Sequence, residues 1–184
     1  QNFKTYFMLK LIQDNFGVYL AAFIMWGFLM SFLYNMVKKS SAPNGDKTVM
    51  WISLALFISY MMSDPLLNVA LGYDILDSSF AYVIWALSDL TILLIVWLIA
   101  RKRNLTQAPA KLYIYTGLIV NSSLFLGIYI DINYAYTGSW WFWDVYSITV
   151  NLMDIMMLIA LFSNKDFLGL VKLYRKVKGQ AEPA

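Results

Sequence analysis

The sequence predicts an all-α polytopic membrane protein: a bundle of five transmembrane helices followed by a short basic amphipathic helix. Of its 184 residues, 60% are hydrophobic and only 14% are charged, whereas soluble domains carry roughly 25% charged residues. Five stretches approach the ~20 mostly apolar residues that a spanning helix needs. Short polar segments rich in Pro, Gly, Asp or Lys separate these stretches and are typical of loops.

The expected elements divide the chain into three parts. Residues 1–15 are an interfacial N-terminal segment, because Phe3, Phe7 and Leu11 recur at helical spacing. Residues 16–163 are the membrane domain, and residues 164–184 are a basic cytoplasmic tail. Within the membrane domain we expect spans at 16–37, 48–71, 79–100, 111–130 and 142–162.

The first two spans carry local signals of their own. A cleaved secretory signal is the competing interpretation of residues 16–37, but this run is longer than a signal core and no small-x-small site follows it. Gly27 and Ser31, four residues apart, permit a close helix neighbour. Pro65 removes a backbone donor from the second span, so we expect a kink near Met61.

Residues after the third span complete the expected architecture. An aromatic loop at 131–141 precedes the fifth span, and its Trp residues are typical of the headgroup level. In the tail, Phe167, Leu170, Val171 and Tyr174 share one helical face, and cations occupy the remainder. This pattern favours a helix lying on an anionic leaflet, with a plain stop-transfer tail as the alternative.

The distribution of positive charge predicts an orientation. Lys and Arg gather between spans one and two, between spans three and four, and after span five. The charged residues of the two remaining loops are all Asp. Because cytoplasmic segments carry the excess of Lys and Arg, the N-terminus is expected outside and the C-terminus inside. We expect the bacterial cytoplasmic (inner) membrane. Since the basic residues flank membrane spans, the lipid bilayer is the expected partner and nucleic acid is not.

Composition also restricts the chemistry. The sequence contains no Cys and no His, which excludes disulfides, thiolate nucleophiles, imidazole-ligated haem and Cys- or His-based metal sites. It contains no G-x-x-x-x-G-K-[ST], H-E-x-x-H or G-x-S-x-G motif. We therefore expect a protein that is not an enzyme, and Na⁺ or H⁺ as the bound species.

Polar side chains recur at helical spacing inside four of the spans. Tyr60 and Asp64 lie one turn apart in the second span, Trp85 lies one turn before Asp89 in the third, and Asp154 lies near the middle of the fifth. Such stripes should face the bundle interior, because lipid cannot satisfy them. The predicted ligand- or ion-binding residues are Tyr60, Asp64, Asn68, Trp85, Asp89, Asn121, Asn151 and Asp154.

No basic residue lies at the depth of these acids, since Lys and Arg are missing from residues 48–100 and 112–164. A charge at mid-membrane costs at least ~2.5–3.5 kcal/mol. Asp64, Asp89 and Asp154 must therefore carry a proton, bind a cation, face water or pair with another chain. For a single Asn, interhelical hydrogen bonding is the simpler interpretation, and for Trp85 it is ordinary packing.

Three functions remain in consideration. The first is a small transporter or channel component that moves a cation or proton through intramembrane Asp residues. The alternative is a non-catalytic membrane subunit that docks a partner protein through its polar faces. The third is a binder of a lipid-soluble ligand or pigment. In each case we expect a homo-oligomer or a larger membrane complex.

Overall fold

The computed structural model describes residues 2–41, 47–64, 72, 79–135 and 140–179, and for residues 2–16 and 18 it describes the backbone alone. These residues form helices and contain no strand. The helices are α1 (Asn2–Ser41), α2 (Thr48–Ser63), α4 (Phe80–Ala100), α5 (Ala110–Ile130), α6 (Trp141–Ser163) and α7 (Leu170–Val177).

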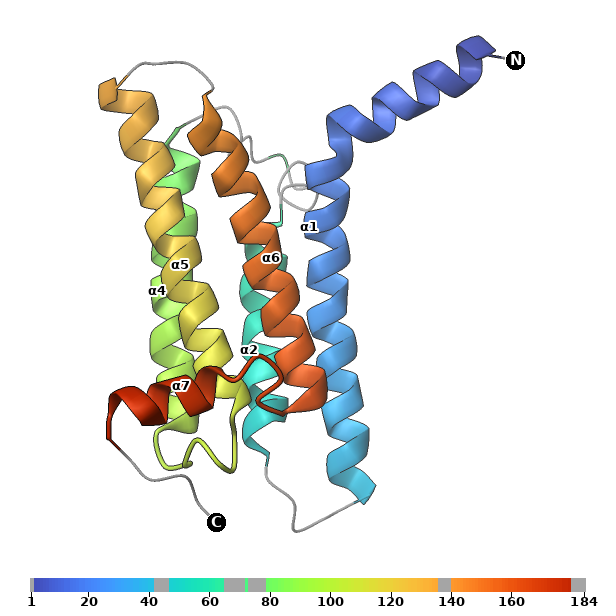
Figure 1. Cartoon of the computed structure of the whole chain (residues 1–184). Helices are drawn as coiled ribbons and strands as arrows, with labels where there is room; N and C mark the ends of the chain where they lie inside the picture. Colours follow the sequence, from blue (N-terminus) through green and yellow to red (C-terminus); the bar gives the residue numbers. More distant parts are fainter. Residues whose placement is uncertain (1, 42–46, 65–71, 73–78, 136–139, 180–184) are drawn as a thin grey trace.

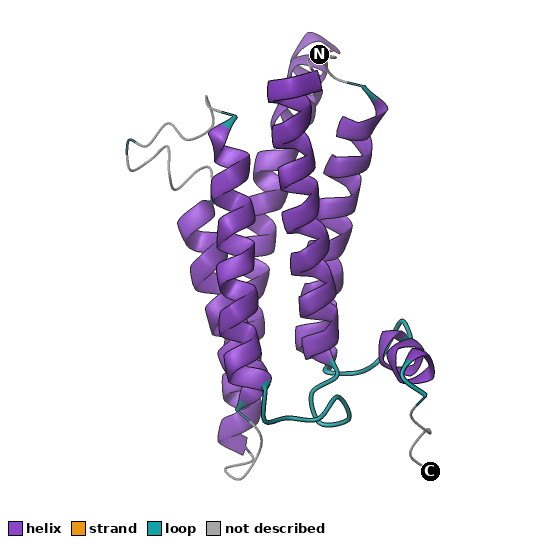
Figure 2. Ribbon diagram, turned by 90° about the vertical axis from the view of Figure 1, so that its left-hand side faces the viewer, coloured by secondary structure: helices purple, strands orange, loops and turns teal. Residues whose placement is uncertain are grey.

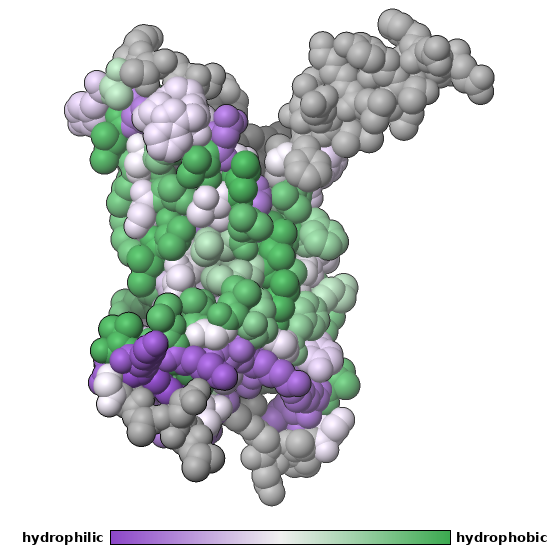
Figure 3. All heavy atoms as spheres, in the orientation of Figure 1, coloured by the Kyte–Doolittle hydropathy of each residue, from purple (hydrophilic) through white to green (hydrophobic). Residues whose placement is uncertain are grey.

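Four helical segments are long and apolar enough to cross a membrane: Tyr19–Ser41, Phe80–Ala100, Ala110–Ala135 and Trp141–Ser163. Together they indicate an integral membrane protein. The shorter α2 has 16 apolar-rich residues. On the face shown in Figure 3, a broad apolar band ends at a row of hydrophilic side chains, where Figure 1 shows α7 crossing the end of the bundle.

Five helices form a closed ring in the order α1, α2, α4, α5, α6 (Figures 1 and 2). Each packs against the next, and α6 returns to pack against α1. The C-terminal ends of α1, α4 and α6 lie at the same end of the bundle as α7, together with the N-terminal ends of α2 and α5 (Figure 1). The ring therefore has an α7 end and an opposite end.

The observed helices agree with three predicted spans to within one residue at each boundary: α4, α5 and α6. The first predicted span differs. Instead of a separate segment at 1–15, α1 runs without a break from Asn2, and its N-terminal part leaves the bundle at an angle (Figure 1). Its apolar segment begins at Tyr19, shortly after Gly17.

The second predicted span, 48–71, is only partly described. Helix α2 ends at Ser63, and Asp64 adopts an extended conformation with φ −64° and ψ 125°. A residue that precedes proline is disfavoured in the helical region, so Pro65 ends the described helix where we predicted a kink near Met61. Residues 65–71 lie outside the described part of the chain.

The predicted aromatic loop at 131–141 begins as a π-helical turn, Asp131–Ala135, that continues α5. The buried Asp131 carboxylate accepts hydrogen bonds from the indole nitrogens of Trp140 (3.0 Å) and Trp143 (2.9 Å). These two Trp residues therefore join the end of α5 to the start of α6, a role that the predicted position at the headgroup level did not include.

Every neighbouring pair in the ring shares a side-chain hydrogen bond. Such bonds are worth about 0.6–2 kcal/mol between membrane helices. In ring order, the pairs are Ser31 with Ser53, Ser59 with Ser88, Ser122 with the Ala86 carbonyl, Asn121 with Asp154, and Asn35 with the Leu161 carbonyl.

Two glycines bring α6 close to its neighbours. A Cβ atom added at Gly27 of α1 would lie 2.6 Å from Leu158 Cδ2, and one added at Gly117 of α5 would lie 2.6 Å from Met157. Real Cβ atoms do not approach this closely. The close helix neighbour predicted for Gly27 is therefore α6, while Ser31 bonds to Ser53 on α2.

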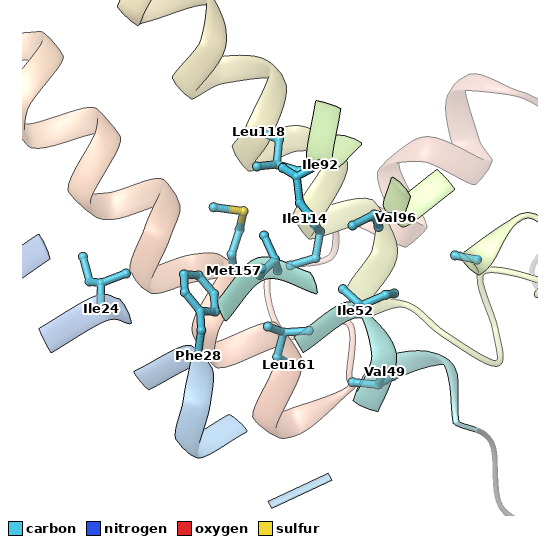
Figure 4. Close-up of a cluster of buried hydrophobic side chains, with 12 residues drawn as sticks. Ile24, Phe28, Val49, Ile52, Ile92, Val96, Ile114, Leu118, Met157 and Leu161 are labelled. Atoms are coloured by element: carbon cyan, nitrogen blue, oxygen red, sulfur yellow. The ribbon is translucent and has the colours of Figure 1, made fainter. Parts of the chain in front are cut away.

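The α7 half of the ring is filled by one apolar cluster to which all five helices contribute (Figure 4). Phe28, Ile52, Val96, Ile114 and Leu161 are each fully buried there. Side chains fill this half, and the cavity described below is lined by residues of the opposite half.

Helix α7 is attached to the bundle through the carboxylate of Asp166. Asp166 accepts hydrogen bonds from the Tyr113 hydroxyl (2.6 Å) and from the backbone N–H groups of Val171 (3.0 Å) and Lys172 (3.1 Å). Burial alone raises the pKa of Asp166, but these hydrogen bonds and the Lys172 charge outweigh it and lower the pKa below its usual value. The carboxylate thus caps α7 and joins it to α5.

We expect docking of α7 to weaken in acid. Because the folded-state pKa of Asp166 lies below the unfolded value of about 3.9, its stabilisation is complete above about pH 4 and is lost as the pH falls through the folded-state pKa. Hydrogen-exchange protection factors of the α7 amides should fall over that range. Asp166→Ala should lower them already at pH 6, whereas Asp144→Ala, at an exposed acid in α6, should not. Unchanged protection in Asp166→Ala would contradict this role.

Candidate functional site

A cavity of about 320 Å³ lies inside the ring and is partly open. All five helices line it, and it occupies the half of the ring opposite the apolar cluster. The described residues around it are Gly17, Ala21, Tyr60, Ser63, Asp64, Trp85, Ser88, Asp89, Asn121, Phe125, Tyr146, Ser147, Val150, Asn151 and Asp154.

Asp154 joins three helices at the inner part of this cavity. Its Oδ1 atom accepts hydrogen bonds from the Tyr60 hydroxyl of α2 (2.6 Å) and from Asn121 Nδ2 of α5 (2.7 Å). The ring of Tyr60 packs on Phe28 with centroids 4.7 Å apart. Because Phe28 belongs to the apolar cluster, Tyr60 marks the boundary between the filled half of the ring and the cavity.

Asp89 of α4 presents the opposite situation. Its side chain is only 7% exposed, and its Oδ2 atom has no hydrogen-bond partner among the described residues. Asn121 Oδ1, from a side chain that is fully buried, also has none there. Since buried polar atoms are almost always hydrogen-bonded, these two acceptors are the groups in the cavity wall that a hydrogen-bond donor could satisfy.

Aromatic rings form much of the remaining wall. Trp85 contacts Phe125 with ring centroids 5.7 Å apart, and Phe125 contacts Tyr146 at 6.0 Å. Tyr82 completes this group by edge contacts with Trp85 (5.3 Å) and Tyr146 (6.0 Å). None of the described residues that line the cavity is Lys or Arg, so the site combines acidic and aromatic groups without a countercharge.

Seven of the eight predicted site residues line this cavity. Asn68 lies outside the described residues. Asn151 is only half-buried, and its Nδ2 atom donates to the Ser147 carbonyl of its own helix (2.7 Å). That the seven residues bind an ion stays a prediction.

Sequence reasoning missed Tyr146 as a lining residue. It precedes Val150 and Asp154 by four and eight residues on α6, so the helical spacing of that face contained the signal.

The carboxylates share a cavity but do not assemble a metal centre. Among the described residues, no group of three or more His, Cys, Asp or Glu side chains could hold a metal ion. Asp89 and Asp154 can instead hold a proton, or accept hydrogen bonds from a cation whose remaining surface meets the aromatic wall.

Fold and site together define a polytopic α-helical membrane protein with an acidic, aromatic interior cavity. No protein-family model matches the chain, and neither does any curated protein or any solved structure.

We expect the Tyr60 hydroxyl to stabilise the ring. Tyr60→Phe removes one donor to Asp154 and should lower the free energy of unfolding in detergent micelles by about 0.6–1.7 kcal/mol. The matched control, Tyr134→Phe, changes an exposed hydroxyl and should have no effect. In an Asp154→Leu background, Tyr60→Phe should cost much less, because the acceptor is already gone. An equal cost in both backgrounds would rule out this contact as the source.

Proposed function

We propose that the protein is a small integral membrane transporter, or channel component, that handles a cation or proton through Asp89 and Asp154. The observation that carries the proposal is Asp89, a buried carboxylate with one oxygen lacking a hydrogen-bond partner among the described residues and lining an interior cavity. Intramembrane acids that face a cavity mark ion and proton pathways more often than structural sites.

The division of the ring supports transport with access from one side at a time. The cavity is partly open, while the apolar cluster of all five helices fills the other half. A transporter that alternates access around a fixed site needs one side closed while the other is open. In a channel, the same cluster would act as a hydrophobic constriction that gates by dewetting.

We further propose that α2 belongs to a fifth span, with the N-terminus outside and the C-terminus inside. The arrangement of helix ends supports this, because the C-terminal ends of α1, α4 and α6 and the N-terminal ends of α2 and α5 all lie at the α7 end of the ring (Figure 1). Most of the basic residues lie at these helix ends or close to them in the sequence, and basic segments are retained on the cytoplasmic side.

Docking of a partner membrane protein is the second candidate. A groove of about 630 Å³ runs between α2 and α4, and Ser59, Ser88 and Thr91 place hydroxyls among its apolar side chains. Polar groups of this kind hold membrane helices together. The two candidates differ in what the purified protein does alone, because a docking subunit needs its partner for any activity.

The topology can be tested by cysteine labelling, since the chain has no native Cys. With five spans, a membrane-impermeant maleimide should label Tyr134→Cys from outside intact cells, but label Ser41→Cys and Lys178→Cys only after lysis. If α2 does not cross the membrane, the helices after it reverse. Tyr134→Cys would then be labelled on the same side as Ser41→Cys.

Flux through the purified protein tests the main proposal. In proteoliposomes, the unaltered protein should dissipate an imposed Na⁺ or pH gradient. Asp89→Asn removes the ionisable carboxyl group from the cavity wall and should reduce the rate at least about tenfold, equivalent to about 1.4 kcal/mol. Asp144→Asn, at an exposed acid outside the cavity, should leave the rate unchanged. No flux of Na⁺, H⁺ or an organic cation above that of empty liposomes, or equal flux in Asp89→Asn, would refute the proposal.

A further inference from the structure

We propose that the cavity binds a protonated primary amine that carries an aromatic group, that is, an arylalkylammonium ion. This inference rests on the proposed function, because it names the class of cation that the same cavity handles. Three features of the cavity carry it: the acceptors that lack a partner, the composition of the wall and the size of the space.

The cavity-lining residues Asp89 and Asn121 each carry a buried acceptor oxygen, Oδ2 and Oδ1 respectively, that has no hydrogen-bond partner among the described residues. Asn121 is oriented by its amide nitrogen, which donates to Asp154, so its oxygen is the free end. A ligand that satisfies both must bring at least two donors. A primary ammonium group has three N–H donors and a positive charge, whereas a quaternary ammonium group has no donor.

The aromatic wall suits the rest of such a molecule. Trp85, Phe125 and Tyr146 line the cavity beside the acidic groups, and the three rings form a contiguous set. Aromatic faces attract ammonium groups by cation–π interaction, and they pack against an aromatic ligand in offset or edge-to-face contacts. Because no described lining residue is Lys or Arg, an anionic ligand would have no countercharge there.

The volume argues against a monatomic cation as the sole occupant. At about 320 Å³, the cavity exceeds the ≈ 30 Å³ share of one water molecule about tenfold. It lies at the lower end of the ≈ 300–1,000 Å³ range of small-molecule pockets, which are also mostly apolar with a few converging polar groups. A Na⁺ ion would leave the aromatic wall without a contact.

Equilibrium dialysis of the purified full chain in detergent micelles tests the inference, with radiolabelled 2-phenylethylammonium as the probe. At pH 7 its amine is charged, because alkylamines titrate near 10. We expect saturable binding of one molecule per chain and a raised Tm. Unlabelled 2-phenylethanol, which lacks the charge, and tetramethylammonium, which lacks N–H donors, should compete at least about tenfold more weakly than the amine.

Variants locate the binding site. Asp89→Asn should weaken the affinity about tenfold or more, and Trp85→Leu should weaken it about fivefold. Trp85→Phe should weaken it less than Trp85→Leu does, because phenylalanine keeps a ring face. Asp144→Asn is the control and should bind like the unaltered protein. Absence of saturable binding, equal competition by 2-phenylethanol, or full affinity in both Asp89→Asn and Trp85→Leu would overturn the inference. The competition series needs no variant, so it decides even if Asp89→Asn does not fold.

The outcomes separate this inference from the function on which it rests. Asp89-dependent Na⁺ or H⁺ flux without amine binding would overturn the inference and leave the transport function supported. Saturable amine binding without flux of Na⁺, H⁺ or the labelled amine would overturn transport and support the inference. Uptake of the labelled amine into proteoliposomes, reduced in Asp89→Asn, would support both.

Discussion

The hydrogen bonds from Tyr60 and Asn121 to Asp154 are the interaction on which the rest of the structure depends. They join α2, α5 and α6 at one carboxylate oxygen, although these helices are not all neighbours in the ring. Lipid offers no donor to a buried carboxylate, so its partners must come from the protein, from water or from a ligand. Once Asp154 is bound in this way, the Asn121 oxygen is turned away from it, and Asp89 on α4 is left as the acidic group without an equivalent partner among the described residues.

Around this point the ring divides into two halves with different physical character. The α7 half is a packed apolar core of the kind that stabilises any helical bundle, and the interhelical serine and asparagine bonds add to it. The other half is not filled by side chains and contains a cavity with acidic and aromatic walls. Tyr60 belongs to both, since its ring packs on Phe28 and its hydroxyl binds Asp154. Tyr60 thus connects Asp154 in the cavity wall directly to Phe28 in the apolar cluster.

Much of this organisation could be predicted from the sequence, because membrane insertion imposes strong rules. Apolar length located α4, α5 and α6, and the period of 3.6 residues placed Asp89, Asn121 and Asp154 on faces that meet in one cavity. What could not be predicted depends on geometry between helices. Spacing along one helix does not show that Asp154 takes both donors while Asp89 keeps a free oxygen, or that Trp140 and Trp143 bind Asp131. Pro65 signalled a disturbance, but only the conformation of Asp64 showed that the helix ends there.

The closed ring has a consequence for biosynthesis. Its last interface joins α1 to α6, where Asn35 donates to the carbonyl of Leu161, 126 residues later in the chain. The ribosome synthesises α6 after the four other helices of the ring. Until then, the face of α1 that packs against α6 has no protein partner from that helix. The cavity gains its final wall at that moment, and a chain truncated before α6 lacks Tyr146, Asn151 and Asp154 from its lining.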